Sequence, residues 1–152
     1  LAAAGGPTSR RIFERALLDT DVRVVANAIE GLDRLGANLR IDALAPLMEH
    51  GDNRIRANAI RALLHRRVPE AASELLKMLS DPRRMHRISA LWLVERMRLT
   101  ALRERVRSVS EADPDPAVRR AAGQALHRLT QQLEARASAV RPCSQWYSDQ
   151  PR

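Results

Sequence analysis

The apolar positions of this chain follow a pattern that returns at a fixed interval along the sequence. The stretch VRVVANAIEGL (residues 22–32) is followed by NRIRANAIRAL (residues 53–63), with Ala-Asn-Ala-Ile in the same register. The stretch DPDPAVRRAAGQAL (residues 113–126) is a third copy, and DPRRMHRISALWLV (residues 81–94) is a weaker one. Apolar residues within each stretch recur three and four positions apart, which is the spacing of one face of an amphipathic helix. Each stretch therefore predicts a helix.

A second amphipathic segment comes before each of these helices. Its apolar positions are Ile12, Phe13, Ala16 and Leu17, then Leu44, Leu47 and Met48, then Leu75, Leu76 and Leu79, and finally Leu102, Val106 and Val109. We therefore expect about four helix pairs, at residues 10–36, 41–66, 69–98 and 100–130. No run alternates apolar and polar residues for long enough to indicate a strand. Because a helix pair cannot cover its own apolar face, the pairs are expected to stack on one another.

The repeated stretches also carry residues that begin helices. An aspartate precedes each second helix, where its carboxylate can accept hydrogen bonds from the free amides of the first turn. These aspartates are Asp21, Asp52, Asp81 and Asp115. Pro82 and Pro116 then occupy the first helical position, where a missing N–H costs nothing. A small residue recurs on the apolar face, at Ala28, Ala59, Ala90 and Ala122. Such a residue allows neighbouring helices to approach closely.

The order Asp, then Val/Ile-Arg, then Ala, then Ala-Leu resembles the HEAT repeat, over residues 10–129. Its period, the offset from Asn27 to Asn58, is shorter than the ~40–47 residues of most HEAT arrays. It is similar to the short HEAT-like repeat of phycobilisome lyases, which is common in bacterial proteins. The resemblance implies an all-α fold, a right-handed α-solenoid. It also implies a ladder of contacts between neighbouring repeats, formed by the turn aspartate and the second-helix arginine. The residues at these positions are Asp52 with Arg56 and Asp115 with Arg119. The first unit departs from this pattern, because Val25 stands where the arginine is expected.

Three segments are expected along the chain. Residues 1–9 form a mobile N-terminal segment, residues 10–135 the HEAT-like repeat domain, and residues 136–152 a C-terminal tail or cap. The last helix is expected to continue through LTQQLEARASAV, residues 129–140. Trp146 and Tyr147 follow in a stretch without periodicity, where they either cover the end of the core or mark a docking point.

Composition adds charge to this picture. The formal net charge is +8, and every basic residue except Lys77 is arginine. A strongly basic chain favours nucleic acid, an anionic surface or an acidic protein as its partner, but so one-sided a choice of arginine also fits a compositional bias. Cys143 is the single cysteine, which excludes an internal disulfide. No apolar run approaches the ~18 residues of a membrane span. We expect a cytoplasmic protein.

No catalytic or metal-binding motif stands out. The four histidines are scattered without the His-Glu-x-x-His spacing of a zinc site. A Gly-rich phosphate loop and a Gly-x-Ser-x-Gly nucleophile elbow are both missing from the sequence. The acidic pairs, Asp113 with Asp115 and Glu70 with Glu74, are best explained as turn, cap and first-turn residues. We therefore expect neither an enzyme nor a bound cofactor or metal.

A polar stripe runs along the second helices, on the side away from their apolar face. Its members lie three and four positions apart in each helix and so share one surface. The residues expected to bind a partner are Arg23, Asn27, Arg54, Asn58, Arg61, Trp92, Arg96 and Arg128. In HEAT-like solenoids the second helices line the concave face, so the stripe forms a shallow groove with Trp92 in its floor. The opposing interpretation packs Trp92 between repeats and leaves the arginines merely solvated.

These features favour a non-enzymatic protein-interaction module, a scaffold or adaptor within a larger protein. Its groove would bind an acidic or polar segment of another protein through arginine and aromatic side chains. The alternative is nucleic-acid binding by the same basic groove. A HEAT-like alkylpurine DNA glycosylase is the enzymatic form of that alternative, with Trp92 and Glu30 as the nearest aromatic and acidic residues. A chromophore-lyase role has the type of repeat as its only support.

Overall fold

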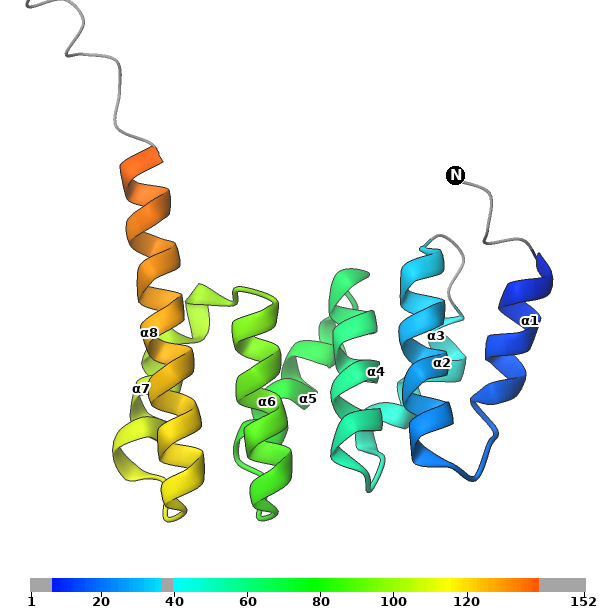
Figure 1. Cartoon of the computed structure of the whole chain (residues 1–152), viewed down its shortest axis with the longest axis horizontal. Coiled ribbons are helices and arrows are strands. Elements are labelled where there is room, and N and C mark those ends of the chain that lie inside the picture. The colour runs from blue at the N-terminus through cyan, green and yellow to red at the C-terminus, as the bar shows by residue number, and fades with distance from the viewer. Residues whose placement is uncertain (1–6, 37–39, 140–152) are drawn as a thin grey trace, which may run out of the picture. The chain divides into compact units, whose positions relative to one another are not determined.

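The structure, a computed structural model, describes residues 7–36 and 40–139, and these form helices without any strand among them (Figure 1). The chain divides into two compact units, residues 1–93 (unit 1) and 94–152 (unit 2). The first helices are α1 (Pro7–Ala16), α3 (Ile41–Leu44) with the 3₁₀ helix η1 (Ala45–Glu49), α5 (Pro69–Leu79), and η2 (Thr100–Leu102) with α7 (Arg103–Ala112). The second helices are α2 (Val22–Leu35), α4 (Asn53–His65), α6 (Arg84–Arg96) and α8 (Pro116–Ala139). The expected all-α fold of four helix pairs is confirmed.

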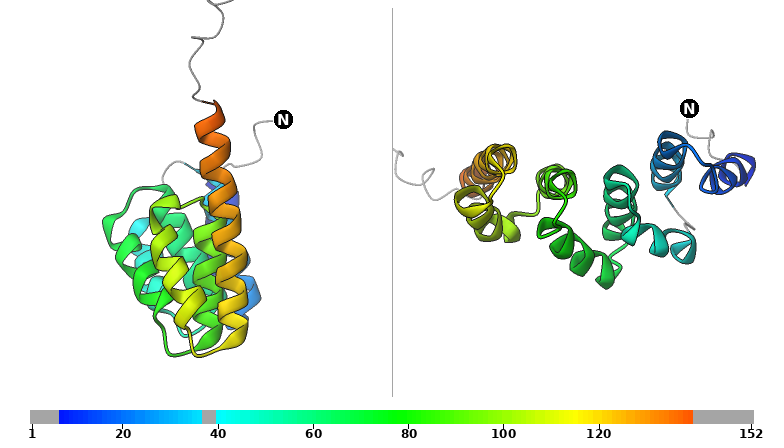
Figure 2. Two further views of the ribbon diagram at one scale, coloured as in Figure 1. Left: turned by 90° about the vertical axis from the view of Figure 1, so that its left-hand side faces the viewer. Right: turned by 90° about the horizontal axis from the view of Figure 1, so that it is seen from below.

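Unit 1 consists of α1 to α5 and most of α6, and its helices lie in two layers. Figure 1 shows α2 and α4 side by side, with α3, η1 and α5 in the layer behind them. The view from below in Figure 2 shows the same two layers end-on. Helix α4 packs against η1 and α5 as well as against α2. The second helices of unit 1 therefore share a surface that the first helices do not cover.

The recurring apolar positions form the core. Ala28, Ala59 and Ala90 are at most 2% exposed, so the matched alanines do lie between closely packed helices. Ile29 and Ile60, the next residues in two of these stretches, are fully buried. The helical phase deduced from the sequence is therefore confirmed in unit 1, since a shift of one position would place the alanines at the surface.

Helix α1 packs closely on α2 because of a glycine. A Cβ atom at Gly31 would lie 2.5 to 2.9 Å from three ring atoms of Phe13. Real Cβ atoms do not approach a ring so closely, so any larger residue at position 31 would displace the phenylalanine. Phe13 thus fills the place that the side chain of residue 31 leaves empty.

Three of the four expected N-caps are confirmed. Asp21 accepts from the N–H of Arg23 at 2.8 Å, and Asp52 accepts from Arg54 and Ile55 at 2.8 and 3.1 Å. The carboxylate of Asp115 accepts from the backbone N–H groups of residues 117 and 118, with Pro116 as the first helical residue.

The prediction that Asp81 caps α6 is wrong, because α6 begins only at Arg84. Asp81 accepts from the backbone N–H of Arg83 at 2.9 Å, within the turn before the helix. Its other carboxylate oxygen lies 2.7 Å from a guanidinium nitrogen of Arg56. The ladder therefore joins Arg56 to the aspartate of the following repeat, while Asp52 serves as a cap.

Three second helices end with a backbone feature that recurs from repeat to repeat, and the sequence pattern does not indicate it. Gly36, Arg67 and Arg98 occupy matching positions in successive repeats, and all have a positive φ, of 75°, 57° and 54°. After α4, the N–H of Val68 bonds to the carbonyl of Leu63 at 3.1 Å, which is the long hydrogen bond of a Schellman motif. Residues 99 and 94 form the same bond after α6. Glycine favours this conformation and arginine does not, so two of these helix ends are strained.

Two expected apolar positions lie at the surface. Ile12 is 62% exposed and Leu76 is 44% exposed, although their neighbours Phe13 and Leu75 are half-buried and buried. The expected first helix of the second pair is also interrupted. Pro46 has no N–H to donate to the preceding turn, and the α-helix gives way to η1 at Ala45.

In unit 2, α7 packs along α8 as a helical hairpin. Val106 of α7 and Val118, Ala122 and Leu129 of α8 are fully buried and form its core. Helix α8 continues to Ala139, as expected for the final helix, and its last turns are exposed. Within the described ranges, every helix is too short or too polar to cross a membrane. Cys143, Trp146 and Tyr147 lie outside the described residues, so the expectations about them stay predictions.

Candidate binding surface of the second helices

The eight expected binding residues all lie on second helices. Arg23 and Asn27 belong to α2, and Arg54, Asn58 and Arg61 to α4. Trp92 lies on the part of α6 in unit 1, while Arg96 and Arg128 belong to unit 2. Matched positions on α2, α4 and α6 face the same side of unit 1, because the repeat keeps the same buried face in each helix. The contacts of each residue then decide how much of it a partner could reach.

Arg61 is engaged in a nearly buried ionic cluster around Asp33 of α2. Its Nε lies 3.5 Å from Asp33 Oδ2, and the arginine and aspartate side chains are 12% and 8% exposed. Arg66 donates to Asp33 Oδ1 at 2.7 Å, and His65 Nδ1 lies 3.1 Å away. Burial opposes ionisation of Asp33, but the hydrogen bonds from Arg66 and His65 outweigh it and hold the pKa of this carboxyl below its ordinary value. Arg61 therefore ties α4 to α2 and offers little of its guanidinium to a partner.

Two asparagines of α4 also connect neighbouring repeats. Asn58 donates from Nδ2 to the carbonyl oxygen of Ala26 in α2 at 3.1 Å. Asn53 donates to the hydroxyl oxygen of Ser89 in α6 at 2.6 Å. These bonds join residues 32 and 36 positions apart in sequence. Asn58 is therefore half-buried and its amide already bonds to α2, whereas its repeat equivalent Asn27 is exposed.

Other charges on the same surface are neutralised locally. The guanidinium of Arg23 lies 3.0 Å from the carboxylate of Asp21, and Arg34 lies 2.7 Å from Glu30 on the preceding turn of α2. Hydrogen bonding to Arg23 lowers the pKa of Asp21 below its ordinary value, which keeps the carboxylate ionised. Glu30, the acid considered for a glycosylase, is therefore held by Arg34. The basic stripe of unit 1 is interrupted by acids rather than continuous.

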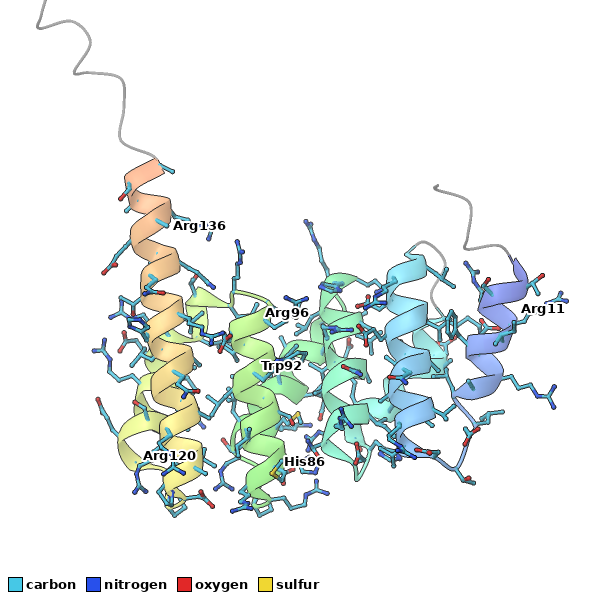
Figure 3. The ribbon with its side chains drawn as sticks, viewed as in Figure 1. Arg11, His86, Trp92, Arg96, Arg120 and Arg136 are labelled. Carbon is cyan, nitrogen blue, oxygen red and sulfur yellow. The ribbon has the colours of Figure 1, made fainter. Side chains whose placement is uncertain are left out.

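Trp92 differs from its repeat equivalents. Glu30 and Arg61 occupy the matching positions on α2 and α4 and are held in ion pairs, whereas Trp92 is 45% exposed. Figure 3 shows its indole extending from α6 on the side toward α4. Met85, two turns earlier on the same face, is 48% exposed. Trp92 and Met85 thus present apolar surface among polar side chains, and Trp92 is not fully packed between the repeats.

Arg54 remains available on this surface of unit 1. It is exposed, and its side chain makes no ion pair or hydrogen bond with the described residues. We call Asn27, Arg54, Met85 and Trp92 the tryptophan surface. It combines one aromatic, one thioether, one guanidinium and one amide, which suits recognition of a peptide better than chemistry on a bound substrate.

The two expected binding residues of unit 2 also differ from each other. Arg96, at the end of α6, is exposed and has no acidic partner among the described residues. Arg128 of α8 pairs with Glu95 of α6. This pair joins a third-repeat acid to a fourth-repeat base, as Asp33 and Arg66 join the first repeat to the second. Sequence reasoning missed these pairs, although an acid followed 33 positions later by a base was a usable signal.

The described residues include no group of three or more histidine, cysteine, aspartate or glutamate side chains placed to hold a metal ion. The densest charged group lies inside unit 1, where Arg56, Glu74 and Asp81 are each less than a tenth exposed. His86 lies beside it, at the start of α6 near Gly51 (Figure 3), with its Nε2 3.1 Å from the carbonyl of that glycine. This group holds α4, α5 and α6 together and is closed to a ligand.

Comparison with known proteins agrees with the repeat architecture. The family model for HEAT repeats matches residues 41–127. Among solved structures, one titled "Crystal structure of Cex1p" is similar, with a TM-score of 0.53 and 19% sequence identity. That similarity covers 86% of this chain but 29% of the other, and it concerns the fold alone. No curated protein matches the sequence. Since the family model spans more than half of the chain, the chain belongs to the HEAT repeat family.

Proposed function

We propose that this chain is a non-enzymatic interaction module that binds an acidic or polar segment of a partner protein through the tryptophan surface. HEAT repeats generally mediate protein interaction, and the short period of the repeat favours the phycobilisome-lyase type. The observation that carries the proposal is the exposure of Trp92 at a position where the two preceding repeats have engaged ionic side chains.

The energetics of interfaces support this choice of anchor. A half-exposed tryptophan has a large apolar area still to bury, and tryptophan and arginine are among the residues that most often dominate binding energy. Arg54 supplies a cation on the neighbouring helix that no described acid pairs with. An acidic peptide lying across α4 and α6 could therefore cover the indole and pair with the guanidinium at once.

The interrupted charge of the stripe speaks against nucleic acid as the ligand. Phosphate-binding surfaces need several unpaired cations along the path of the backbone. Here Arg23, Arg34 and Arg61 face acids within unit 1. Single-strand binders also place several aromatic side chains along the strand, whereas Trp92 is the aromatic residue of this surface.

The test is a selection from a display library of random peptides against the purified chain, followed by affinity measurements on synthetic copies of the selected peptides. We expect enrichment of peptides with acidic residues beside an apolar one. Trp92→Ala should weaken their binding by about thirtyfold or more, since a hot-spot truncation costs at least about 2 kcal/mol.

Leu76→Ala is the matched control. Leu76 is 44% exposed, close to the value for Trp92, but it lies on α5 in the other layer. This control should change the affinity less than about twofold. Equal losses in Trp92→Ala and Leu76→Ala would mean that the peptides respond to exposed apolar area in general, and would contradict the proposal.

A titration with mixed-sequence duplex and single-stranded DNA, at low and at physiological salt, tests the alternative. We expect weak binding that disappears at physiological salt. Tight binding that persists there and falls with Arg54→Ala would identify a phosphate-binding surface and overturn the protein-binding assignment.

A further inference from the structure

A second polar site lies in unit 2 and shares no residue with the tryptophan surface. The last turns of α8 extend past the end of α6 and the start of η2, and together they line an open cavity of about 750 Å³. The polar residues that line it are Arg98, Thr100, Arg128, Gln131, Gln132 and Arg136. Met97 and two alanines complete the lining. The volume lies in the range of about 300–1,000 Å³ that is usual for ligand sites.

The lining is positively charged and contains no acidic residue. Arg128 is neutralised by Glu95. Arg98 and Arg136 make no ion pair with any of the described residues, so two guanidinium groups face the cavity without a counter-charge. Arg98 also holds left-handed backbone, with φ of 54°, which fixes its position directly after α6. Two such guanidinium groups in one concave site favour a carboxylate or phosphate as ligand.

A buried acceptor narrows the choice between these anions. The Oε1 atom of Gln132 is inaccessible to solvent and has no hydrogen-bond partner among the described residues. A buried acceptor of this kind is costly unless a donor reaches it. A nucleic-acid phosphodiester has only acceptor atoms and would leave this oxygen unpaired. A peptide has a backbone N–H close to its carboxylate and could satisfy both requirements.

We propose that this cavity is a binding site for a peptide carboxylate, with Arg98 and Arg136 pairing with the carboxylate and the buried amide of Gln132 turning into the cavity to accept from a neighbouring backbone N–H. The carboxylate could belong to the end of a polypeptide chain or to an acidic side chain. The site depends on residues of unit 2 alone. It would give the chain a second contact with a partner, independent of Trp92.

NMR titrations of the full chain, labelled with ¹⁵N, use three small peptides to distinguish a C-terminal carboxylate from an acidic side chain. They are N-acetyl-trialanine with a free carboxylate, the same peptide as its C-terminal amide, and N-acetyl-Ala-Glu-Ala amide. We expect saturable shifts at Gln132 and at the Nε–H groups of Arg98 and Arg136 with at least one of the two carboxylate peptides. Which of them binds more tightly identifies the source. The neutral amide should produce no saturable shift.

Variants then test which side chains bind the carboxylate of the peptide. Arg98→Gln and Arg136→Gln should each weaken binding of the carboxylate peptide by about fivefold or more. Arg120→Gln is the matched control, since Arg120 is exposed near the opposite end of α8 (Figure 3), and it should change the affinity less than about twofold. Gln132→Glu keeps the size of the side chain but repels a carboxylate, so binding should be lost while the helical circular dichroism is unchanged. Trp92→Ala should leave this binding intact, which separates failure of this site from failure of the tryptophan surface.

Four results would overturn the proposal. They are equal binding of the neutral amide, loss of binding in Arg120→Gln as large as in Arg136→Gln, tighter binding of inorganic phosphate than of either carboxylate peptide, and no saturable shift with any peptide.

Discussion

The substitution Arg56→Met tests whether the buried ionic group of unit 1 holds the repeats together. Arg56 is 7% exposed and makes three polar contacts, each to a different part of the unit. Its Nε donates to the carbonyl of Met48 at 2.8 Å, and its terminal nitrogens lie 2.7 Å from Asp81 and 3.5 Å from Glu74. Methionine can fill much of the same volume but supplies no donor. The variant therefore removes the hydrogen-bond donor to the Met48 carbonyl and the positive charge that faces the carboxylates of Asp81 and Glu74.

The magnitude follows from what remains around the two acids. Removing one partner of a buried ion pair costs about 3–5 kcal/mol, because the other charge stays buried. Here Asp81 keeps Arg83 at 3.0 Å, and Glu74 keeps Lys77 at 2.6 Å. Each carboxylate thus retains one cation, although those cations are half or more exposed to solvent. We expect a loss near the lower end of the range, about 3 kcal/mol.

The assay is equilibrium unfolding in urea, which adds no ionic strength, followed by circular dichroism. The matched control is Arg54→Met. Arg54 lies two positions earlier on the same helix, but its side chain is exposed and makes no polar contact with the described residues. The control should change the free energy of unfolding by less than about 0.5 kcal/mol. A loss below about 1 kcal/mol for Arg56→Met, or equal losses in both variants, would refute a stabilising role for the buried group.

Four further predictions use the same unfolding assay. Asp52→Ala removes the acceptor for two amides of α4 and should cost about 1 kcal/mol, so an unchanged urea midpoint would contradict capping. Arg67→Gly should stabilise the chain by about 1 kcal/mol and Gly36→Ala should destabilise it by a similar amount, since both have positive φ; the opposite signs would exclude left-handed helix ends. Ala59→Leu should cost roughly 1–3 kcal/mol by overpacking, because Ala59 is fully buried. Burial lowers the pKa of His86 below its ordinary 6.5, so the unfolded chain binds this proton more readily. Stability should therefore fall between about pH 7.5 and 5.5, and it should fall less in His86→Gln.

The candidate binding surface was predicted only in part, because a stripe of polar positions does not show which side chains are already paired. Spacing placed Arg61 and Trp92 at equivalent positions on neighbouring helices. The tertiary structure then gave Arg61 an acid from the preceding repeat, Asp33, and left Trp92 exposed. The cavity of unit 2 had no sequence signal, because Arg98 and Arg136 come together only when the end of α8 folds past η2.

The sequence by itself determined the helical repeat. The spacing of apolar residues set the helical phase, and the alanines represented by Ala59 marked where helices touch. Local hydrogen bonding to Asp52 and Asp115 set the helix starts, since a cap involves only the next few positions of the chain. The tertiary structure alone decided which charges are paired. It moved Asp81 from the expected cap to a buried partner of Arg56, because that bond spans 25 positions and depends on how α4 stacks against the following repeat.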